Sequence, residues 1–409
     1  MPYRDFDLKL SGTGNDGYYV EAIGSPHSIR SNPVRLQLPH EEIESWRVSL
    51  RQGIANRKTT VTLGRHLFEA LFPREILRIW EANRSDVDSR NALRLRLDVR
   101  SAELALVPWE IIHDGRGYIA MTRDTPLVRC SYDHRQVKAT ANTLPLNILL
   151  IVATPRDSPV LPNIESEVEL IESGIAGLKH DRKVGRVDII RRATRQRLQD
   201  QLAVSDYHVL HYMGHGTFEN DKGYLVFENE NGFAERVSGE TVSYFFGDAP
   251  LRLLFLNACN TAVASDAESF LGVAHAALVA GVPAIVAMQD AVPDSVAAKF
   301  ARQFYETLAM DQPLECCMVE GRKAISGEIS ADWSIPVLFS NADEGLLWTP
   351  RPAKWDDVDS GPYTRASPHQ VVIEGDSNTV VQGNGNVVGK NISKISHVYY
   401  GPERDKKPT

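Results

Sequence analysis

The chain has 409 residues, of which 43% are hydrophobic and 24% are charged. This composition is typical of a globular protein with two or three domains and excludes a fibrous or largely disordered chain. Lys and Arg total 45 against 53 Asp and Glu, so the net charge of −8 gives no uniformly basic surface, and we predict no nucleic-acid binding. Only four cysteines occur, which excludes a disulfide framework and indicates a reducing, cytoplasmic compartment.

The first 140 residues predict a smaller α+β unit, which we interpret as a platform or regulatory domain (1–140). Residues 18–22 and 34–38 have strand character, and residues 41–57 form a helix candidate after Pro39. Residues 93–99 alternate between apolar and polar types, which predicts a strand with one buried face and one wet face.

From Pro145 onward the pattern changes to that of an α/β domain, which we delimit as 141–349. Short apolar runs are typical of strands buried on both faces of a parallel sheet, and helical patterns lie between them. The runs are 147–152, 187–190, 207–213, 251–256 and 284–288, and the helical segments are 164–178, 192–203, 268–280 and 294–309. Strand alternating with helix predicts βαβ crossovers and a three-layer α/β sandwich with a mostly parallel sheet.

One uncharged stretch, residues 269–289, has the length of a membrane span. The sequence Gly281-Val282-Pro283 interrupts it, so we interpret the stretch as a buried helix, a turn and a buried strand. The N-terminus lacks the basic flank and apolar run of a signal peptide. We therefore predict no membrane span.

The C-terminal residues differ in composition from the rest. Residues 350–369 are rich in Pro, Asp, Ser and Gly and predict a linker. Residues 370–409 hold an eight-residue repeat of Gly, Asn and Val, with 375–382 followed by 383–390. Such a repeat suits stacked β-arcs, but two copies are too few for an independent solenoid. The tail is either a β-stacking oligomerisation motif, formed when identical tails assemble, or a solvated tail with one hairpin.

Two chemically reactive side chains follow predicted strands. His215 lies after strand 207–213, and Cys259 lies after strand 251–256. If these strands are parallel neighbours, both residues leave the sheet at its carboxyl edge. A free thiol titrates near pH 8.5, so a nearby imidazole is needed to generate thiolate at neutral pH.

The residues beside this pair are small. Gly214, Gly216 and Ala258 leave space for a peptide backbone to approach. The main-chain N–H groups of Gly216 and Cys259 are candidate donors of an oxyanion hole for a tetrahedral intermediate. The same residue types also occur in ordinary cores and turns, so the pattern favours a catalytic dyad only when the two strand ends meet.

Three segments together resemble the CHAT family, the caspase-like branch of the clan that also holds separase. They are His211-Tyr212-Met213-Gly214-His215-Gly216, Leu256-Asn257-Ala258-Cys259 and the stretch 280–288. Residues 106–114, which include Trp109 as an expected core anchor, resemble the segment that precedes CHAT peptidase cores. The resemblance covers about residues 90–340 and implies a caspase-like fold.

The resemblance implies a cysteine endopeptidase with Cys259 as nucleophile and His215 as general base and acid. Gly216 and Cys259 would supply the oxyanion hole, and no cofactor or metal is expected. Relatives act in prokaryotic immunity or programmed death, which implies a protein substrate such as a pore-forming effector. We expect the tail to connect the peptidase to an upstream sensor. His211 is interpreted as structural, and Cys316 and Cys317 as core residues.

Substrate preference depends on Asp290 and Asp294, which follow the last apolar run. In separase-like relatives an acidic residue in this region lines the pocket for the P1 side chain. Asp290 in that role would select Arg or Lys at P1, whereas Asp294 is expected to cap the next helix. Two other functions stay open: a catalytically silent adaptor that signals by tail-mediated oligomerisation, and a thiol hydrolase that acts on a small amide.

Overall fold

The structure is a computed structural model of the chain, and Met1–Pro350 forms one compact unit and Arg351–Thr409 a second. The residues that it describes are 3–24, 29–85, 87, 92–131, 145–161, 164–220, 222–246, 250–258, 265–290, 292–327, 331–342, 345–348, 371–373 and 379–381.

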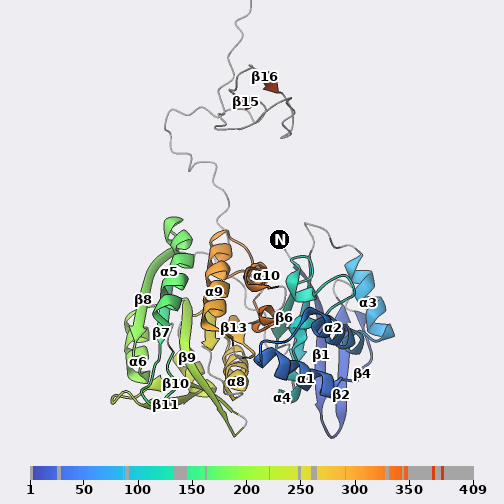
Figure 1. Ribbon diagram of the computed structural model, residues 1–409, viewed down its shortest axis with the longest axis horizontal. Coiled ribbons are helices and arrows are strands. Elements are labelled where there is room, and N and C mark those ends of the chain that lie inside the picture. The colour runs from blue at the N-terminus through green and yellow to red at the C-terminus, as the bar shows by residue number, and fades with distance from the viewer. Residues whose placement is uncertain are drawn as a thin grey trace, which may run out of the picture. The chain divides into compact units, whose positions relative to one another are not determined.

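The N-terminal part of the first unit combines helices with strands that form one end of a sheet running through the whole unit (Figure 1). Its elements are β1 (Tyr3–Thr13), β2 (Gly17–Gly24), β3 (Ile29–Arg30), β4 (Val34–Leu36), α1 (His40–Arg51), α2 (Arg57–Leu71), α3 (Arg74–Arg84), β5 (Ala92–Val99), α4 (Ala102–Ala105), η1 (Trp109–Ile111), η2 (Ile119–Met121) and β6 (Leu127–Cys130). Strand β1 pairs antiparallel with β2 and parallel with β5, and β5 pairs parallel with β6.

The second part alternates strands and helices, as predicted. Its elements are β7 (Leu146–Val152), α5 (Ile164–His180), β8 (Val184–Arg191), α6 (Arg195–Val204), β9 (Val209–Glu219), β10 (Lys222–Glu228), β11 (Ala234–Ser238), α7 (Gly239–Phe246), β12 (Leu253–Ala258), α8 (Ser265–Val279), β13 (Ala284–Met288), α9 (Asp294–Ala309), α10 (Leu314–Ile325), η3 (Asp332–Ser334) and β14 (Pro336–Ser340).

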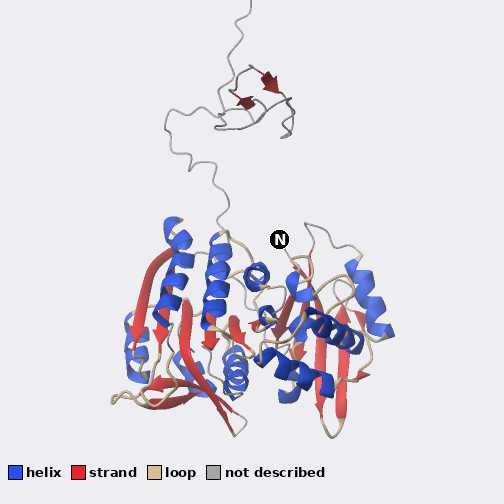
Figure 2. Cartoon of the chain, in the orientation of Figure 1, coloured by secondary structure: helices blue, strands red, loops and turns tan. Residues whose placement is uncertain are grey.

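The strands of this part form a mostly parallel sheet between helical layers (Figure 2). Strands β8, β7, β9, β12 and β13 lie side by side and are parallel, and β14 is antiparallel to β13. On its other side β14 pairs parallel with β6, so the sheet continues into the N-terminal strands. The connections β7–β8 and β8–β9 run in opposite directions along the sheet, so right-handed crossovers put α5 and α6 on opposite faces. Helix α9 packs beside α5. The predicted α/β sandwich is confirmed.

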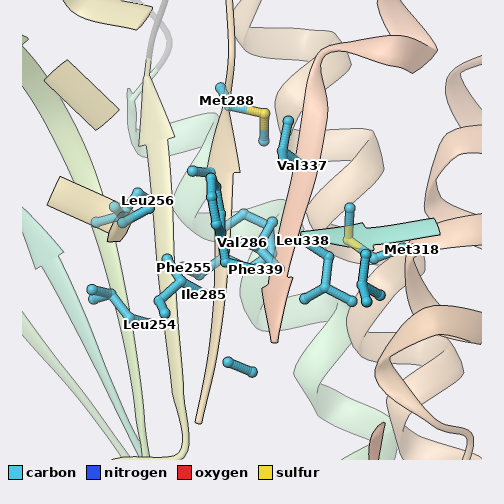
Figure 3. Packing of buried hydrophobic residues seen from close by; sticks show 14 of the residues in the cluster. Leu254, Phe255, Leu256, Ile285, Val286, Met288, Met318, Val337, Leu338 and Phe339 are labelled. Carbon is cyan, nitrogen blue, oxygen red and sulfur yellow. The ribbon is translucent and has the colours of Figure 1, made fainter. Parts of the chain in front are cut away.

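The centre of the sheet is packed from both faces because its strands are continuous apolar runs. Figure 3 shows side chains of three neighbouring strands, including Leu254 and Phe255 of β12, Val286 of β13 and Leu338 of β14, with Met318 of α10 beside β14. All five of these residues are buried. The carboxyl edge of the sheet is therefore built on a rigid support.

His211 belongs to this core. Its ring stacks on Phe255 with 4.3 Å between the ring centroids, and Nδ1 lies 3.1 Å from the Tyr305 hydroxyl. Complete burial lowers the pKa of His211 to about 3, because the charged imidazolium cannot be solvated there. His211 therefore stays neutral and structural, as predicted.

Strand β5 is buried along almost its whole length, so the predicted wet face is wrong. Arg94 and Arg96 are buried because carboxylates from neighbouring elements pair with them. Arg94 donates to Asp5 of β1 at 2.8 Å and to Glu315 of α10 at 2.6 Å, and Arg96 donates to Asp5 at 2.8 Å. The alternating pattern correctly identified the polar positions of this strand. Their side chains are buried in ion pairs, however, and do not contact solvent.

The predicted helix 41–57 extends too far, because residues 52–56 form a non-helical connection to the next helix. Helix α1 ends at Arg51, and Asn56 caps α2 by accepting a hydrogen bond from the Thr59 N–H. Gly53 between them has a φ of +67°, a conformation that glycine adopts without steric cost.

The segment 106–114 builds a buried polar cluster around Glu110. Trp109 is fully buried, as expected. The Arg129 guanidinium donates to both carboxylate oxygens of Glu110, at 2.7 and 3.2 Å. The Gln289 side chain, directly after β13, accepts from Arg129 at 2.9 Å and donates to Glu110 at 2.8 Å. The cluster thus ties η1 and β6 to the end of β13.

The uncharged stretch 269–289 folds as the end of α8, a turn and β13, as predicted. Within the described part of the chain, no helix has the length and apolar character needed to cross a bilayer. Helix α9 starts at Asp294 with Pro293 as its N-cap, so the expected capping role of Asp294 is wrong by one position.

The second unit contains one described hairpin, formed by β15 (Val371–Ile373) and β16 (Thr379–Val381). The two strands are antiparallel, with Val372 opposite Val380. The second copy of the eight-residue repeat, 383–390, lies outside the described residues.

The Glu110 cluster yields a stability prediction. Glu110→Ala leaves the Arg129 guanidinium buried without its carboxylate, and we expect a loss of about 3–5 kcal/mol in the free energy of unfolding. Chemical denaturation of the full chain measures it. The control is Glu320→Ala, which removes an exposed partner of Arg123 and should cost less than about 1 kcal/mol. Equal losses for the two variants would contradict a buried ion pair.

Candidate active site

The site is built on the parallel pairing of β9 and β12. The register runs from Val209 opposite Leu253 to Gly214 opposite Ala258, the last pair among the described residues. The expectation that these strands are parallel neighbours is confirmed. His215 is the next residue after the last described pair on β9, and Cys259 follows Ala258 of β12 in the sequence.

The sequence predicted that His215 follows the end of its strand, but His215 lies within β9. Strand β9 continues beyond Gly214 to Glu219 and forms a hairpin with β10, in which His215 lies opposite Val226. The side chain is fixed in this position because Nε2 lies 2.9 Å from the carbonyl oxygen of Pro159. A carbonyl only accepts, so Nε2 carries the proton and Nδ1 keeps a free lone pair when the ring is neutral.

The Pro159 carbonyl is a contact of the candidate histidine that the residue types in the sequence did not indicate. It lies in the connection between β7 and α5, and any residue type supplies a main-chain carbonyl. No side-chain motif could therefore have indicated it. The hydrogen bond orients the imidazole and fixes its tautomer without a third catalytic side chain.

The space beside Gly214 serves a different purpose from the predicted one. A Cβ atom at Gly214 would lie 2.6 Å from the Tyr212 hydroxyl, so the ring of Tyr212 fills the room that glycine leaves. That hydroxyl lies 2.9 Å from the carbonyl oxygen of His215 and 2.7 Å from that of Val226, as a shared donor. Tyr212 thus holds the hairpin at the level of the histidine.

Cys259, the predicted nucleophile, lies outside the described residues, as do 260–264. The residue two positions earlier is described and is buried. The Asn257 side-chain amide donates to the buried carboxylate of Glu167, in the first turn of α5. The end of β12 is therefore anchored to α5 just before the cysteine.

The three described cysteines, Cys130, Cys316 and Cys317, are buried, and their thiols are poor nucleophiles. Burial raises the pKa of the Cys130 thiol to about 12, and it also raises the pKa of Cys316 and of Cys317. Thiolate formation at neutral pH is suppressed at all three positions.

Gly216 and Asp290 are the remaining predicted site residues. Gly216 lies in the β9–β10 ladder opposite Leu225, one residue beyond His215. Asp290 follows β13 at the carboxyl edge and is 3% exposed. Its carboxylate lies 3.1 Å from Nε of Arg51 and 3.9 Å from Nε of Arg47, both on α1.

A cavity of about 610 Å³ opens between the end of β5, the start of β10 and helix α8. Leu106, Leu271 and Ala276 give it apolar walls, and Arg100 and Lys222 lie among its polar lining residues. Among the described residues, neither His215 nor Asp290 lines it.

Comparison with solved structures finds distant similarity. Separase of Saccharomyces cerevisiae, solved with securin, has 13% identity and a TM-score of 0.45 over 83% of this chain and 30% of that chain. The Arg-specific cysteine proteinase gingipain R has 12% identity and a TM-score of 0.42 over 72% of this chain and 70% of that chain. The complex of the RgpB pro- and mature domains of Porphyromonas gingivalis has 11% identity and a TM-score of 0.40, covering 76% of this chain and 78% of that chain. This chain thus spans less than a third of the separase that it matches.

No curated protein matches the chain. The family model described as "CHAT domain" matches residues 61–348, which is well over half of the 409 residues. The match includes β9, β12 and the segment 106–114 that the sequence analysis singled out. The chain therefore belongs to the CHAT domain family.

Proposed function

We propose that the chain is a cysteine endopeptidase in which Cys259 is the nucleophile and His215 the general base. One observation carries the proposal: Gly214–Ala258 is the last described pair of the β9–β12 register, and His215 and Cys259 directly follow these two residues in the sequence. The hydrogen bond from His215 to the Pro159 carbonyl supports it, because the ring is already oriented with one basic nitrogen left.

The reaction follows from that tautomer. Nδ1 of His215 takes the thiol proton of Cys259, and the thiolate attacks the scissile carbonyl carbon. The resulting imidazolium, held by the Pro159 carbonyl, returns the proton to the leaving amine as the C–N bond breaks. Water then attacks the thioester with His215 acting as base again, which releases the acid product and restores the thiol.

The oxyanion and the P1 side chain need further groups. The main-chain N–H groups of Gly216 and Cys259 hold the oxyanion of the tetrahedral intermediate. Asp290 accepts a basic P1 side chain, and its present pairing with two arginines supports this role, since it demonstrates that the carboxylate accommodates guanidinium groups.

The proposed substrate is a partner protein in a prokaryotic immune or programmed-death pathway, such as a pore-forming effector in the cytoplasm. Residues 1–140 act as a regulatory platform for the peptidase core at 141–349. The linker 350–369 leads to the tail 370–409, which connects the peptidase to an upstream sensor and gathers copies of the chain.

The central test is proteomic identification of new N-termini made by the full chain but absent with Cys259→Ala. We expect cleavage after Lys or Arg, no cleavage with Cys259→Ala, and a loss of about 10²–10⁴-fold in rate with His215→Ala. The control is His180→Ala, an exposed histidine at the end of α5.

Two results would contradict the proposal. A biological phenotype that survives Cys259→Ala, with no new N-termini, would favour the silent adaptor. Release of ammonia or amine from small amides without peptide cleavage would favour a thiol hydrolase.

The tail provides a second test. Deletion of 370–409 is expected to reduce partner-triggered assembly and activation and to leave intrinsic cleavage of a short peptide unchanged, because the tail lies outside the peptidase core. Sedimentation velocity and cleavage assays with and without the partner measure the two effects. Unchanged assembly and activation after the deletion would exclude tail-driven control.

A further inference from the structure

We infer that Arg51 of α1 occupies the P1 pocket of the resting chain and competes with the basic side chain of the substrate. The inference rests on the proposed role of Asp290 and adds a regulatory contact to it. Helix α1 lies more than 200 residues before β13 in the sequence. The contact would therefore let the N-terminal part of the chain control substrate binding.

The Asp290 carboxylate follows β13 at the carboxyl end of the sheet. In the β12–β13 register Leu256 lies opposite Ala287, so counting on by two residues brings position 289 level with Ala258. Asp290 follows one residue later in the chain, as His215 follows Gly214 on β9. A carboxylate at this level of the edge is within the reach of a side chain that flanks a scissile bond.

Arg51 covers part of the Asp290 carboxylate. Asp290 is 3% exposed, whereas the Arg51 side chain is 30% exposed. The partly exposed guanidinium of Arg51 donates to this buried carboxylate, with Nε at 3.1 Å, and so covers part of it. A substrate arginine that approached Asp290 from there would have to displace Arg51.

Asp290 paired with Arg51 and Asp290 paired with a substrate arginine are similar in energy. A buried carboxylate needs a cationic partner, and a P1 arginine offers the same guanidinium that Arg51 supplies. Arg47, four residues earlier on the same helix face, lies 3.9 Å away and keeps a positive charge near Asp290 during the exchange. Exchange thus replaces one ion pair by an equivalent one.

The consequence is a reduced apparent affinity for basic substrates. When the binding-competent state is a fraction of the population, the apparent dissociation constant rises by the inverse of that fraction. If Arg51 fills the pocket in about 90–99% of molecules, basic ligands bind about 10–100-fold more weakly than the open pocket would allow. Any partner that draws α1 away from β13 would activate the enzyme.

The test measures binding separately from catalysis. The full chain carrying Cys259→Ala is titrated with agmatine, which has the side-chain chemistry of arginine, and with its uncharged urea analogue, by calorimetry. Arg51→Gln is expected to bind agmatine at least about tenfold more tightly than the parent. Arg51→Lys, which keeps the charge but loses the planar fork, should give a smaller gain. Adding Asp290→Asn to Arg51→Gln should abolish the gain.

The controls make each outcome decisive. Arg302→Gln removes an exposed arginine that pairs with Glu306 on α9, and it should leave agmatine binding unchanged. Unchanged or weaker binding with both Arg51 variants overturns the inference, as does a gain that survives Asp290→Asn or extends to the urea analogue. If the agmatine pattern holds while the chain with intact Cys259 releases no new N-termini, the competition between Arg51 and a basic ligand at Asp290 stands and the proposed peptidase activity falls. Cleavage without an agmatine gain removes the inference alone.

Discussion

The register between β9 and β12 is the constraint on which the candidate site depends. In a parallel pair the two chains advance together, so residues that follow one registered pair leave the sheet at the same edge. A slip of one residue would turn each side chain to the opposite face and would take His215 away from that edge. The register is fixed by burial on both faces, where Phe255 of β12 packs between His211 and the aromatic side chains of α9.

A second set of contacts fixes the position of the His215 imidazole at this end of the sheet. The Tyr212 hydroxyl holds the β9–β10 hairpin, and the Pro159 carbonyl fixes the ring of His215. On the neighbouring strand, Glu167 holds Asn257, two residues before Cys259. For the candidate histidine, a main-chain oxygen atom and buried side chains therefore provide the orientation that a third side chain supplies in Ser-His-Asp peptidases.

The sequence predicted the α/β part well because the central strands β7, β12 and β13 are mostly apolar runs with helical patterns between them. It predicted the N-terminal part less well for two reasons. Strand β1 contains Asp5 and Asp7, which pair with arginines of β5, so the strand lacked an apolar signature. Helix 41–57 was extended too far because the turn at Gly53 lies within a polar stretch.

For the site, residue types and strand order indicated His215 and Cys259, but not the contacts that orient them. The Pro159 carbonyl and the pairing of Asp290 with Arg51 join segments far apart in the chain. A single sequence carries no spacing signal for such contacts. The predicted use of Gly214 was wrong because the ring of Tyr212, two residues earlier on the same strand, folds over it.

The pH dependence of Cys259 alkylation tests the proposed dyad most directly. The three described cysteines are buried with raised thiol pKa values, so iodoacetamide labelling located by mass spectrometry distinguishes Cys259 from them. The proposed dyad predicts rapid labelling of Cys259 below pH 7 in the parent chain. With His215→Ala the labelling should follow an ordinary thiol with a midpoint near about pH 8.5. Identical pH profiles for the two chains would contradict a functional contact between His215 and Cys259.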